Sequence, residues 1–416
     1  MKRPLLALLP LLIAGMLACG ETYSLAPAVA TVDGGQDAGD SNTGGDASSN
    51  RWSTPVIALG PTASCFVGAS GKATCVGSIY SQFCVQGGDG SGGPSCTDLA
   101  FAIDPKTLPL PIRQVSISNT HVCFLAGDAA VGLYCGGKNG FGQIDATPVT
   151  EDAPFVQLKA IAGFESGLED VATGSNYTCA LKAGVVSCWG YDLDPAVNMP
   201  VKLPAAALEL GGGDAFRCAR TATSDVYCWG YNIVPRSEAP DAGAVSKMPV
   251  LMQTQGKVAS LRTSSFSDHA CVRLESGVVS CWGLNNASQT GVEKTTYLVE
   301  RPTPISAVSP GALDVVTAGG HSCALRSSGE VRCWGSNFNG VLGAGTNDST
   351  STAVSVVPMG LDKDVTRLFG GGVSTCALQG SGISSIIKCW GGNAYGQLQD
   401  GSTVTRTTPV IVPFPP

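Results

Sequence analysis

Pairs of cysteines recur along most of the chain and constrain its fold more than any other feature. In seven segments two cysteines flank a short turn sequence, as Cys323 and Cys333 do in HSCALRSSGEVRCWG. The seven pairs are Cys65/Cys75, Cys123/Cys135, Cys179/Cys188, Cys218/Cys228, Cys271/Cys281, Cys323/Cys333 and Cys376/Cys389. Successive first cysteines lie 52 to 58 residues apart, with one step of 39. A period of this size is typical of solenoids, propellers and arrays.

The spacing within each pair predicts a β-hairpin. If Cys323 faces Cys333 on antiparallel strands, Ser327–Gly329 form a three-residue loop with glycine at the left-handed position. In the pair Cys179/Cys188 the same register leaves Ala183-Gly184 as a two-residue turn. Facing Cβ atoms lie about 4.5–5.5 Å apart, close enough for a disulfide after small adjustments. We therefore expect a disulfide within each hairpin and no metal site, since the short Cys-x2-Cys pairs of zinc sites do not occur.

The N-terminus indicates export. Lys2 and Arg3 precede an apolar stretch that is too short to be a good membrane span. The ending LIAGMLAC resembles a bacterial lipobox, which implies cleavage before Cys19 and attachment of lipid to that cysteine. The alternative is an ordinary signal peptide, with which Cys19 would be lost. Seventeen cysteines less Cys19 leave sixteen, an even number that suits disulfides in an oxidising compartment. Gly20 follows in place of an inner-membrane retention aspartate, so we expect an outer-membrane or cell-surface location.

Three regions follow from this pattern: a lipoprotein signal peptide at 1–18, a linker at 19–50 and a repeat domain at 51–416. The linker is rich in Gly, Ser and Asp, has little to bury and is expected to be disordered. It either holds the folded domain about 30 Å from a membrane or is a loose terminus without a role. A further pair, Cys84-Cys96, closes a glycine-rich insertion in the first repeat. This insertion is either a contact element on one rim or a neutral surface loop.

The sequences after the second cysteines carry a family resemblance. WGSNFNGVLGAG (334–345) and WGGNAYGQLQDG (390–401) resemble the repeats of the RCC1 family, the regulator of chromosome condensation. GKNGFGQI (137–144) and WGLNNASQTG (282–291) match in part, and the repeats at Cys179 and Cys218 lack the Gly-Gln-Leu ending. The resemblance implies an all-β, seven-bladed propeller with four strands in each blade. Because the first repeat lacks a Pro-x-x-Val strand, we expect Val410 and Val412 at the C-terminus to pair into the first blade and close the ring.

Few residues suggest catalysis. His121, His269 and His321 each stand two residues before a first cysteine, in a position that Tyr177 and Phe216 occupy in other repeats. This exchange favours packing, although residues from equivalent positions could also converge on a central channel. The tryptophans after the second cysteines are expected to pack the blades; they are Trp189, Trp229, Trp282, Trp334 and Trp390. The glycine runs at 211–213 and 370–372 precede repeat strands without a following helix, which argues against phosphate binding.

Two classes of function stay open. With a net charge of -7 and 14% charged residues, nucleic-acid binding is not expected. The first class is a monomeric, non-catalytic module without cofactor that binds a protein partner at the cell surface and contacts the membrane only through lipid on Cys19. The second is a hydrolase or lyase of envelope polymers with acidic residues on one rim, for which Asp192, Asp194 and Asp214 are candidates.

Overall fold

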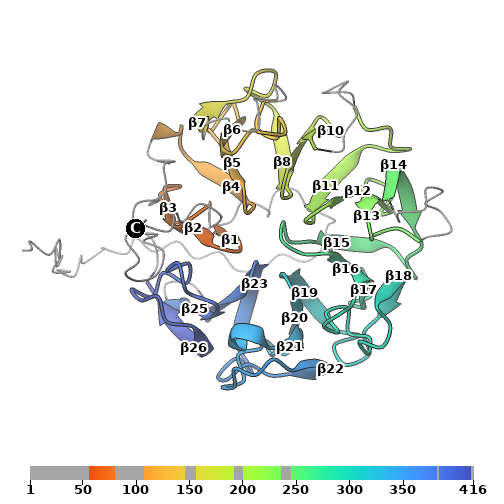
Figure 1. The fold of residues 1–416 in the computed structure, drawn as a ribbon, viewed down its shortest axis with the longest axis vertical. Helices are drawn as coiled ribbons and strands as arrows, with labels where there is room; N and C mark the ends of the chain where they lie inside the picture. Colours follow the sequence, from red (N-terminus) through yellow and green to blue (C-terminus); the bar gives the residue numbers. More distant parts are fainter. Residues whose placement is uncertain are drawn as a thin grey trace, which may run out of the picture. The chain divides into compact units, whose positions relative to one another are not determined.

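The chain folds into a ring of seven small antiparallel sheets. The structure is a computed structural model that describes residues 56–79, 107–145, 156–191, 200–235, 245–381 and 384–413. Within these ranges the elements are strands and short turns, and the sheets follow one another in chain order around a centre (Figure 1). The expected all-β, seven-bladed propeller is therefore confirmed.

Each blade is built from consecutive strands, of which the first lies next to the centre (Figure 1). Blade one has β1 (Val56–Leu59), β2 (Ala63–Val67) and β3 (Ala73–Gly77); blade two has β4 (Ile112–Ile117), β5 (His121–Ala126), β6 (Gly132–Gly137) and β7 (Val156–Ala160). Blade three has β8 (Leu168–Thr173), β9 (Tyr177–Lys182) and β10 (Val185–Gly190); blade four has β11 (Ala207–Gly212), β12 (Phe216–Thr221), β13 (Val226–Tyr231) and β14 (Val245–Met252). Blade five has β15 (Val258–Arg262), β16 (His269–Leu274), β17 (Val279–Leu284) and β18 (Leu298–Pro304). Blade six has β19 (Ala312–Thr317), β20 (His321–Arg326), β21 (Val331–Ser336), the 3-10 helix η4 (Phe338–Gly340) and β22 (Ser351–Val356); blade seven has β23 (Val365–Gly371), β24 (Ser374–Gln379), β25 (Ile386–Gly391) and β26 (Arg406–Val412).

The hairpin between the second and third strands has the register that the cysteine spacing predicts. Cys323 faces Cys333 across β20 and β21. The tight turn at Ala183-Gly184 has φ angles of 51° and 74°, the left-handed values that a two-residue hairpin loop requires. The structure forms seven disulfides within hairpins: Cys65-Cys75, Cys123-Cys135, Cys179-Cys188, Cys218-Cys228, Cys271-Cys281, Cys323-Cys333 and Cys376-Cys389. The pair Cys84-Cys96, the lipidation position Cys19 and the segments 1–18 and 19–50 lie outside the described residues.

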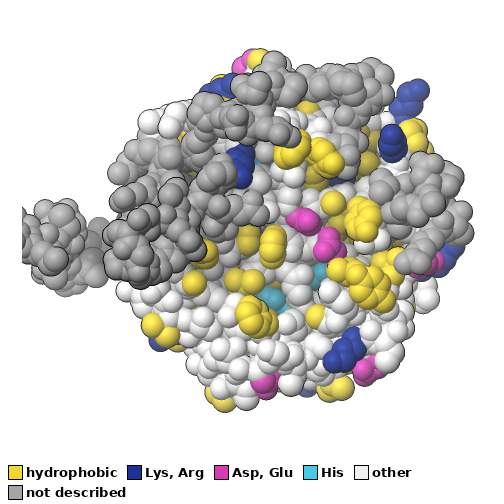
Figure 2. Space-filling view, viewed as in Figure 1, with side chains coloured by type: hydrophobic (Ala, Val, Ile, Leu, Met, Phe, Trp, Pro, Cys, Tyr) yellow, Lys and Arg dark blue, Asp and Glu magenta, His cyan; other side chains and the backbone are white. Residues whose placement is uncertain are grey.

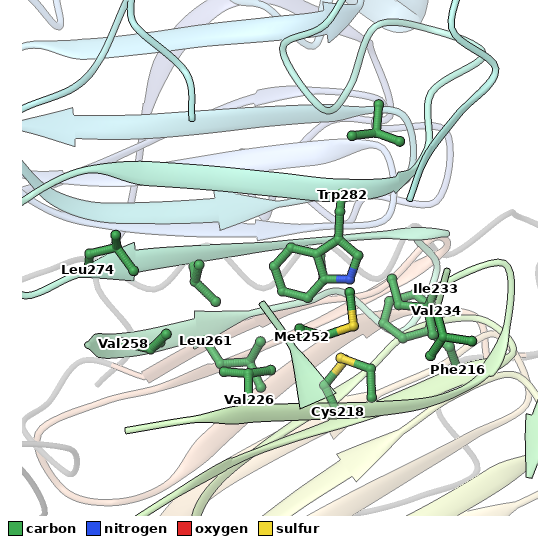
Figure 3. Close-up of a cluster of buried hydrophobic side chains, with 14 residues drawn as sticks. Phe216, Cys218, Val226, Ile233, Val234, Met252, Val258, Leu261, Leu274 and Trp282 are labelled. Atoms are coloured by element: carbon green, nitrogen blue, oxygen red, sulfur yellow. A yellow bond between two sulfur atoms is a disulfide. The ribbon is translucent and has the colours of Figure 1, made fainter. Parts of the chain in front are cut away.

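Hydrophobic cores lie between neighbouring blades. The core between blades four and five contains Phe216 and Met252 from the former and Leu261 and Trp282 from the latter (Figure 3). The indole of Trp282 is fully buried there, and Cys218 of the blade-four disulfide points into the same core. The tryptophans thus pack the blades as expected, and each disulfide adds apolar surface between two blades.

The prediction that the C-terminal strand completes the first blade is wrong. Val410 and Val412 on β26 face Cys389 and Ile387 on β25, so β26 is the outer strand of blade seven. The equivalent strand β14 pairs with β13 in the same way. The Pro-x-x-Val segment therefore ends a repeat and does not begin the next one.

The ring closes through side chains instead. Ile57, Leu59 and Phe66 of blade one share a core with blade seven. Nε2 of Gln397 donates to the carbonyl of Pro61 at 3.3 Å, and Nε2 of Gln399 donates to Oγ of Ser64 at 3.0 Å. The contact between the last and first blades is thus of the same kind as the contacts between other neighbours.

A bulge recurs in the first strand of six blades and places a polar residue beside the next blade. In each of these strands the residue that directly follows the extra one is polar, and we call it the bulge residue; these residues are Gln114, Asp170, Glu209, Ser260, Asp314 and Arg367. Oδ2 of Asp170 accepts a hydrogen bond from the backbone N–H of Leu210 at 2.7 Å, and Oε2 of Glu209 accepts one from Leu261 at 3.1 Å. These bonds link consecutive first strands near the centre.

Candidate binding face

One face of the ring carries the loops between first and second strands and those between third and fourth strands. We call it the loop face, and the opposite face, with the hairpin turns, the turn face. Strands in a blade are antiparallel, so these two sets of loops must lie at the same end. Figure 2 shows histidine atoms near the centre of the ring. Because all three histidines begin second strands, that view shows the loop face.

The histidines join neighbouring blades. Each ring is buried, and its Nε2 atom lies within hydrogen-bond distance of a hydroxyl on the residue before the first cysteine of the following blade. The pairs are His121 with Thr178 at 2.8 Å, His269 with Ser322 at 2.7 Å and His321 with Thr375 at 2.7 Å. Burial lowers the pKa of each histidine to about 3. These neutral, enclosed rings are structural and do not form a joint site in the channel.

Two carboxylates lie beside the channel mouth on this face. Asp214, in the loop after β11, accepts a hydrogen bond from Oγ of Ser175, and its N–H donates to the carbonyl of Ser267 at 2.9 Å. Burial and the negative charge of Asp214 raise the pKa of Asp268 to about 6. The other predicted candidates, Asp192 and Asp194, lie outside the described residues.

A longer loop brings Asp268 to the mouth. Six residues, 263–268, separate β15 from β16, whereas three separate β4 from β5. Oγ of Ser265 in this loop donates to the carbonyl of Ile117 in blade two, which is not a neighbour of blade five. The loop therefore lies across the channel, and Thr263, Ser264 and Ser265 help to line a cavity of ≈ 200 Å³ between the first strands. In the sequence, the longer spacing between the first strand of blade five and His269 is the signal that would have identified this loop.

Exposed aromatic side chains lie on the loops of this face in blades two to five. They include Phe141, Tyr191, Tyr231 and Phe266, each between 38% and 51% exposed. The rings of Phe141 and Tyr191 meet edge to face with centroids 4.8 Å apart. We call these four residues the aromatic patch. Figure 2 shows hydrophobic side chains around the acidic and histidine atoms at the centre of this face. Large half-exposed aromatic side chains are typical of protein interfaces.

Arg217 holds one residue of the aromatic patch, Tyr191, through its backbone. Its guanidinium lies 3.7 Å from the ring centroid of Tyr177, and its Nη2 donates to the carbonyl of Tyr191 at 3.2 Å. Tyr177 in turn donates to the carbonyl of Gly213 at 2.9 Å, across the boundary to blade four. The backbone at Tyr191 is thus held to the neighbouring blade.

Comparison with known proteins agrees with the fold. Residues 315–341 match the family model for the regulator of chromosome condensation (RCC1) repeat. This segment of blade six is similar to an RCC1 repeat. The sequence of the chain is 27% identical to protein pim1 of Schizosaccharomyces pombe, over 49% of this chain and 43% of pim1. It is 25% identical to the ultraviolet-B receptor UVR8 of Arabidopsis thaliana, over 76% of this chain and 73% of UVR8.

Solved structures show the same ring. The crystal structure of Prp20p from Saccharomyces cerevisiae, studied for its binding to Gsp1p and histones, superposes with a TM-score of 0.59 at 16% identity, covering 73% of this chain and 77% of Prp20p. A second structure, yeast RCC1 bound to Kap60, gives a TM-score of 0.59 at 15% identity and covers 73% of this chain and 75% of the other. These likenesses concern the fold alone.

Within the described ranges, no group of three or more His, Cys, Asp or Glu side chains could hold a metal ion. No helix in the same ranges is long and apolar enough to cross a membrane.

Proposed function

We propose that this chain is a lipid-anchored protein of the bacterial cell envelope whose propeller binds another protein through the loop face. RCC1-like propellers are typically non-catalytic binding or scaffolding domains. The observation that carries the proposal is the aromatic patch, which four consecutive blades present around an acidic channel mouth. A rigid support lowers the ordering cost of binding, and aromatic side chains supply much of the energy of protein interfaces.

Two features support an exported location: the disulfides and the sequence before Cys19. Seven disulfides persist only in an oxidising compartment, and the sequence before Cys19 has the form of a lipoprotein signal. Lipid on Cys19 would hold the propeller at a membrane through the linker.

The experiment compares the lipidated protein with Cys19→Ser and with a patch variant, Tyr191→Ser combined with Tyr231→Ser. Each form of the protein is purified from intact envelopes after mild crosslinking, together with any protein bound to it. We expect the native chain to retain one protein partner and the patch variant to lose it, because both rings are exposed and contribute little to folding. Cys19→Ser should bind the same partner in solution but leave the membrane fraction. Recovery of equal amounts of partner by the native chain and the patch variant would contradict the proposal.

A second candidate function is hydrolysis or elimination in an envelope polymer. One observation favours it: Asp268 has a pKa of about 6 beside a second carboxylate, Asp214, as general acid–base pairs often do. The test is degradation of purified envelope polysaccharide by the native chain and by Asp268→Asn. Activity that Asp268→Asn abolishes would establish this function in place of binding.

A further inference from the structure

Blades four and five differ at one pair of facing positions near the turn face. In blade four the bulge residue Glu209 faces Arg220 on the second strand, and Nε of Arg220 donates to Oε2 of Glu209 at 2.9 Å. In blade five the same two positions hold Ser260 and Arg273, which also face each other. Blade five therefore keeps the arginine and replaces the carboxylate by a small hydroxyl.

One buried atom of each blade-five residue, Oγ of Ser260 and Nε of Arg273, has no hydrogen-bond partner among the described residues. Ser260 is 8% exposed, and within the described part of the chain its Oγ makes no hydrogen bond. The same holds for the buried Nε of Arg273, whose Nη1 reaches only the carbonyl of Leu274 at 3.4 Å. A buried donor without a partner is unfavourable, so a ligand that satisfies both groups removes that cost when it binds.

The charge around these groups is positive. Arg262 spans the carboxylates of two blades, with Nη1 at 2.8 Å from Oε1 of Glu209 and Nη2 at 3.2 Å from Oδ1 of Asp314. Arg220 and Arg262 thus pair with Glu209, Arg262 also pairs with Asp314, and the charge of Arg273 lies close to both carboxylates. The pKa values of Arg273 and Arg367 are lowered, chiefly by burial and also by the positive charge of Arg262. The negative charge of Asp314 offsets part of this shift. Three guanidinium groups around two carboxylates favour the binding of an anion beside Arg273.

We propose that the space between Ser260, Arg273 and Arg262 binds an oxyanion, either a carboxylate or a phosphate group. The anion takes the place that the Glu209 carboxylate has beside Arg220, accepting hydrogen bonds from Nε of Arg273 and Oγ of Ser260. Serine carries a hydroxyl in place of the second methylene and the carboxyl group of glutamate, which leaves room for the ligand. Arg262 is 34% exposed along its side chain, so the proposed site borders solvent at this residue. This site lies near the turn face and is independent of the aromatic patch.

Equilibrium dialysis with radiolabelled inorganic phosphate at constant ionic strength tests the proposal, with acetate as the carboxylate competitor. We expect one saturable site on the native chain. Arg273→Gln should weaken binding at least about tenfold, since it removes the charge and the buried donor. Ser260→Glu should abolish binding, because the new side chain supplies the carboxylate itself. Release of phosphate by acetate identifies carboxylates as ligands, and failure of acetate to compete identifies phosphate as the preferred class.

The control variant is Arg332→Gln, which removes a surface arginine paired with Glu330 at 2.6 Å and should leave phosphate binding unchanged. Thermal unfolding without anion gives a second measurement: Ser260→Glu should raise the midpoint above that of the native chain. Absence of saturable binding up to about 10 mM phosphate, or equal binding by the native chain and Arg273→Gln, would overturn the proposal.

Discussion

Nε2 of His321 lies 2.7 Å from Oγ1 of Thr375, and this hydrogen bond joins blade six to blade seven inside the protein. His121 and His269 make the same contact with the blades that follow them. In each case the imidazole is neutral, because burial lowers its pKa to about 3 from an ordinary value of 6.5. The boundaries between blades are therefore sensitive to acid.

The first prediction concerns pH. Between about pH 6.5 and 3 the unfolded chain binds a proton at each histidine and the folded chain does not, so stability falls as the pH is lowered through this window. The loss approaches about 1.4 kcal/mol per pH unit for each histidine. Asp268 acts in the opposite direction, since its folded pKa of about 6 lies above its unfolded value and its contribution is lost as the pH rises.

Urea unfolding between pH 5 and 7 measures this effect. His321→Asn should reduce the slope of stability against pH by about one proton relative to the native chain, because its amide does not titrate. Asp268→Asn should increase the slope below pH 6. A slope that His321→Asn leaves unchanged would show that the ring is protonated in the fold.

A second prediction separates two tryptophans in the cores. Nε1 of Trp390 donates to the carbonyl of Val341 in blade six at 2.8 Å, whereas Nε1 of Trp282 finds no acceptor among the residues that the structure describes. Trp390→Phe should therefore cost about 1–3 kcal/mol more than Trp282→Phe, since only the former leaves a buried carbonyl unpaired. Chemical denaturation of the two variants gives the difference. Equal losses would mean that the indole contributes through packing alone.

A third prediction concerns Glu209, which is buried and accepts hydrogen bonds from Arg220, Arg262 and the backbone of Leu261. Glu209→Gln leaves Arg220 without its carboxylate and Arg262 with that of Asp314 alone, and should cost about 3–5 kcal/mol. The matched control is Glu330→Gln, which breaks a partly exposed pair with Arg332 and should cost less than about 1 kcal/mol. Equal effects of the two changes on unfolding would contradict a role for Glu209 in joining blades four and five.

A fourth prediction concerns the disulfides. Replacing Cys323 and Cys333 by serine should lower stability by roughly 3 kcal/mol, because a loop of about ten residues is freed in the unfolded chain. Hydrogen exchange should increase mainly in blade six and at its boundaries, since the bond is local to one hairpin. Peptide mapping of the native chain should recover Cys323 linked to Cys333; a bond between different repeats would contradict the hairpin pairing.

The hairpins could be predicted from the sequence because the register of facing cysteines depends only on the number of residues between them. The closure of the ring could not. The segment TTPVIV has the same apolar pattern whether it ends blade seven or begins blade one, and only pairing with β25 distinguishes the two. Resemblance among repeats fixes their period but not the point at which a blade begins.

The candidate sites were harder to predict than the fold. Asp214 was identified, but its neighbour Asp268 reaches the mouth through three additional loop residues, whose path depends on the bond from Ser265 to Ile117 in a distant blade. Ser260 and Arg273 were missed because a bulge shifts the register between them, so that a simple alternation of facing residues does not place them together.

Photo-crosslinking in intact cells tests the binding face most directly. A photoreactive phenylalanine analogue replaces either Tyr191 on the loop face or Val185 on the turn face, two residues of the same blade with exposed fractions of 51% and 45%. We expect a discrete crosslinked protein from position 191 and none from position 185. A crosslink from position 185 alone, or the same product from both positions, would contradict recognition through the loop face.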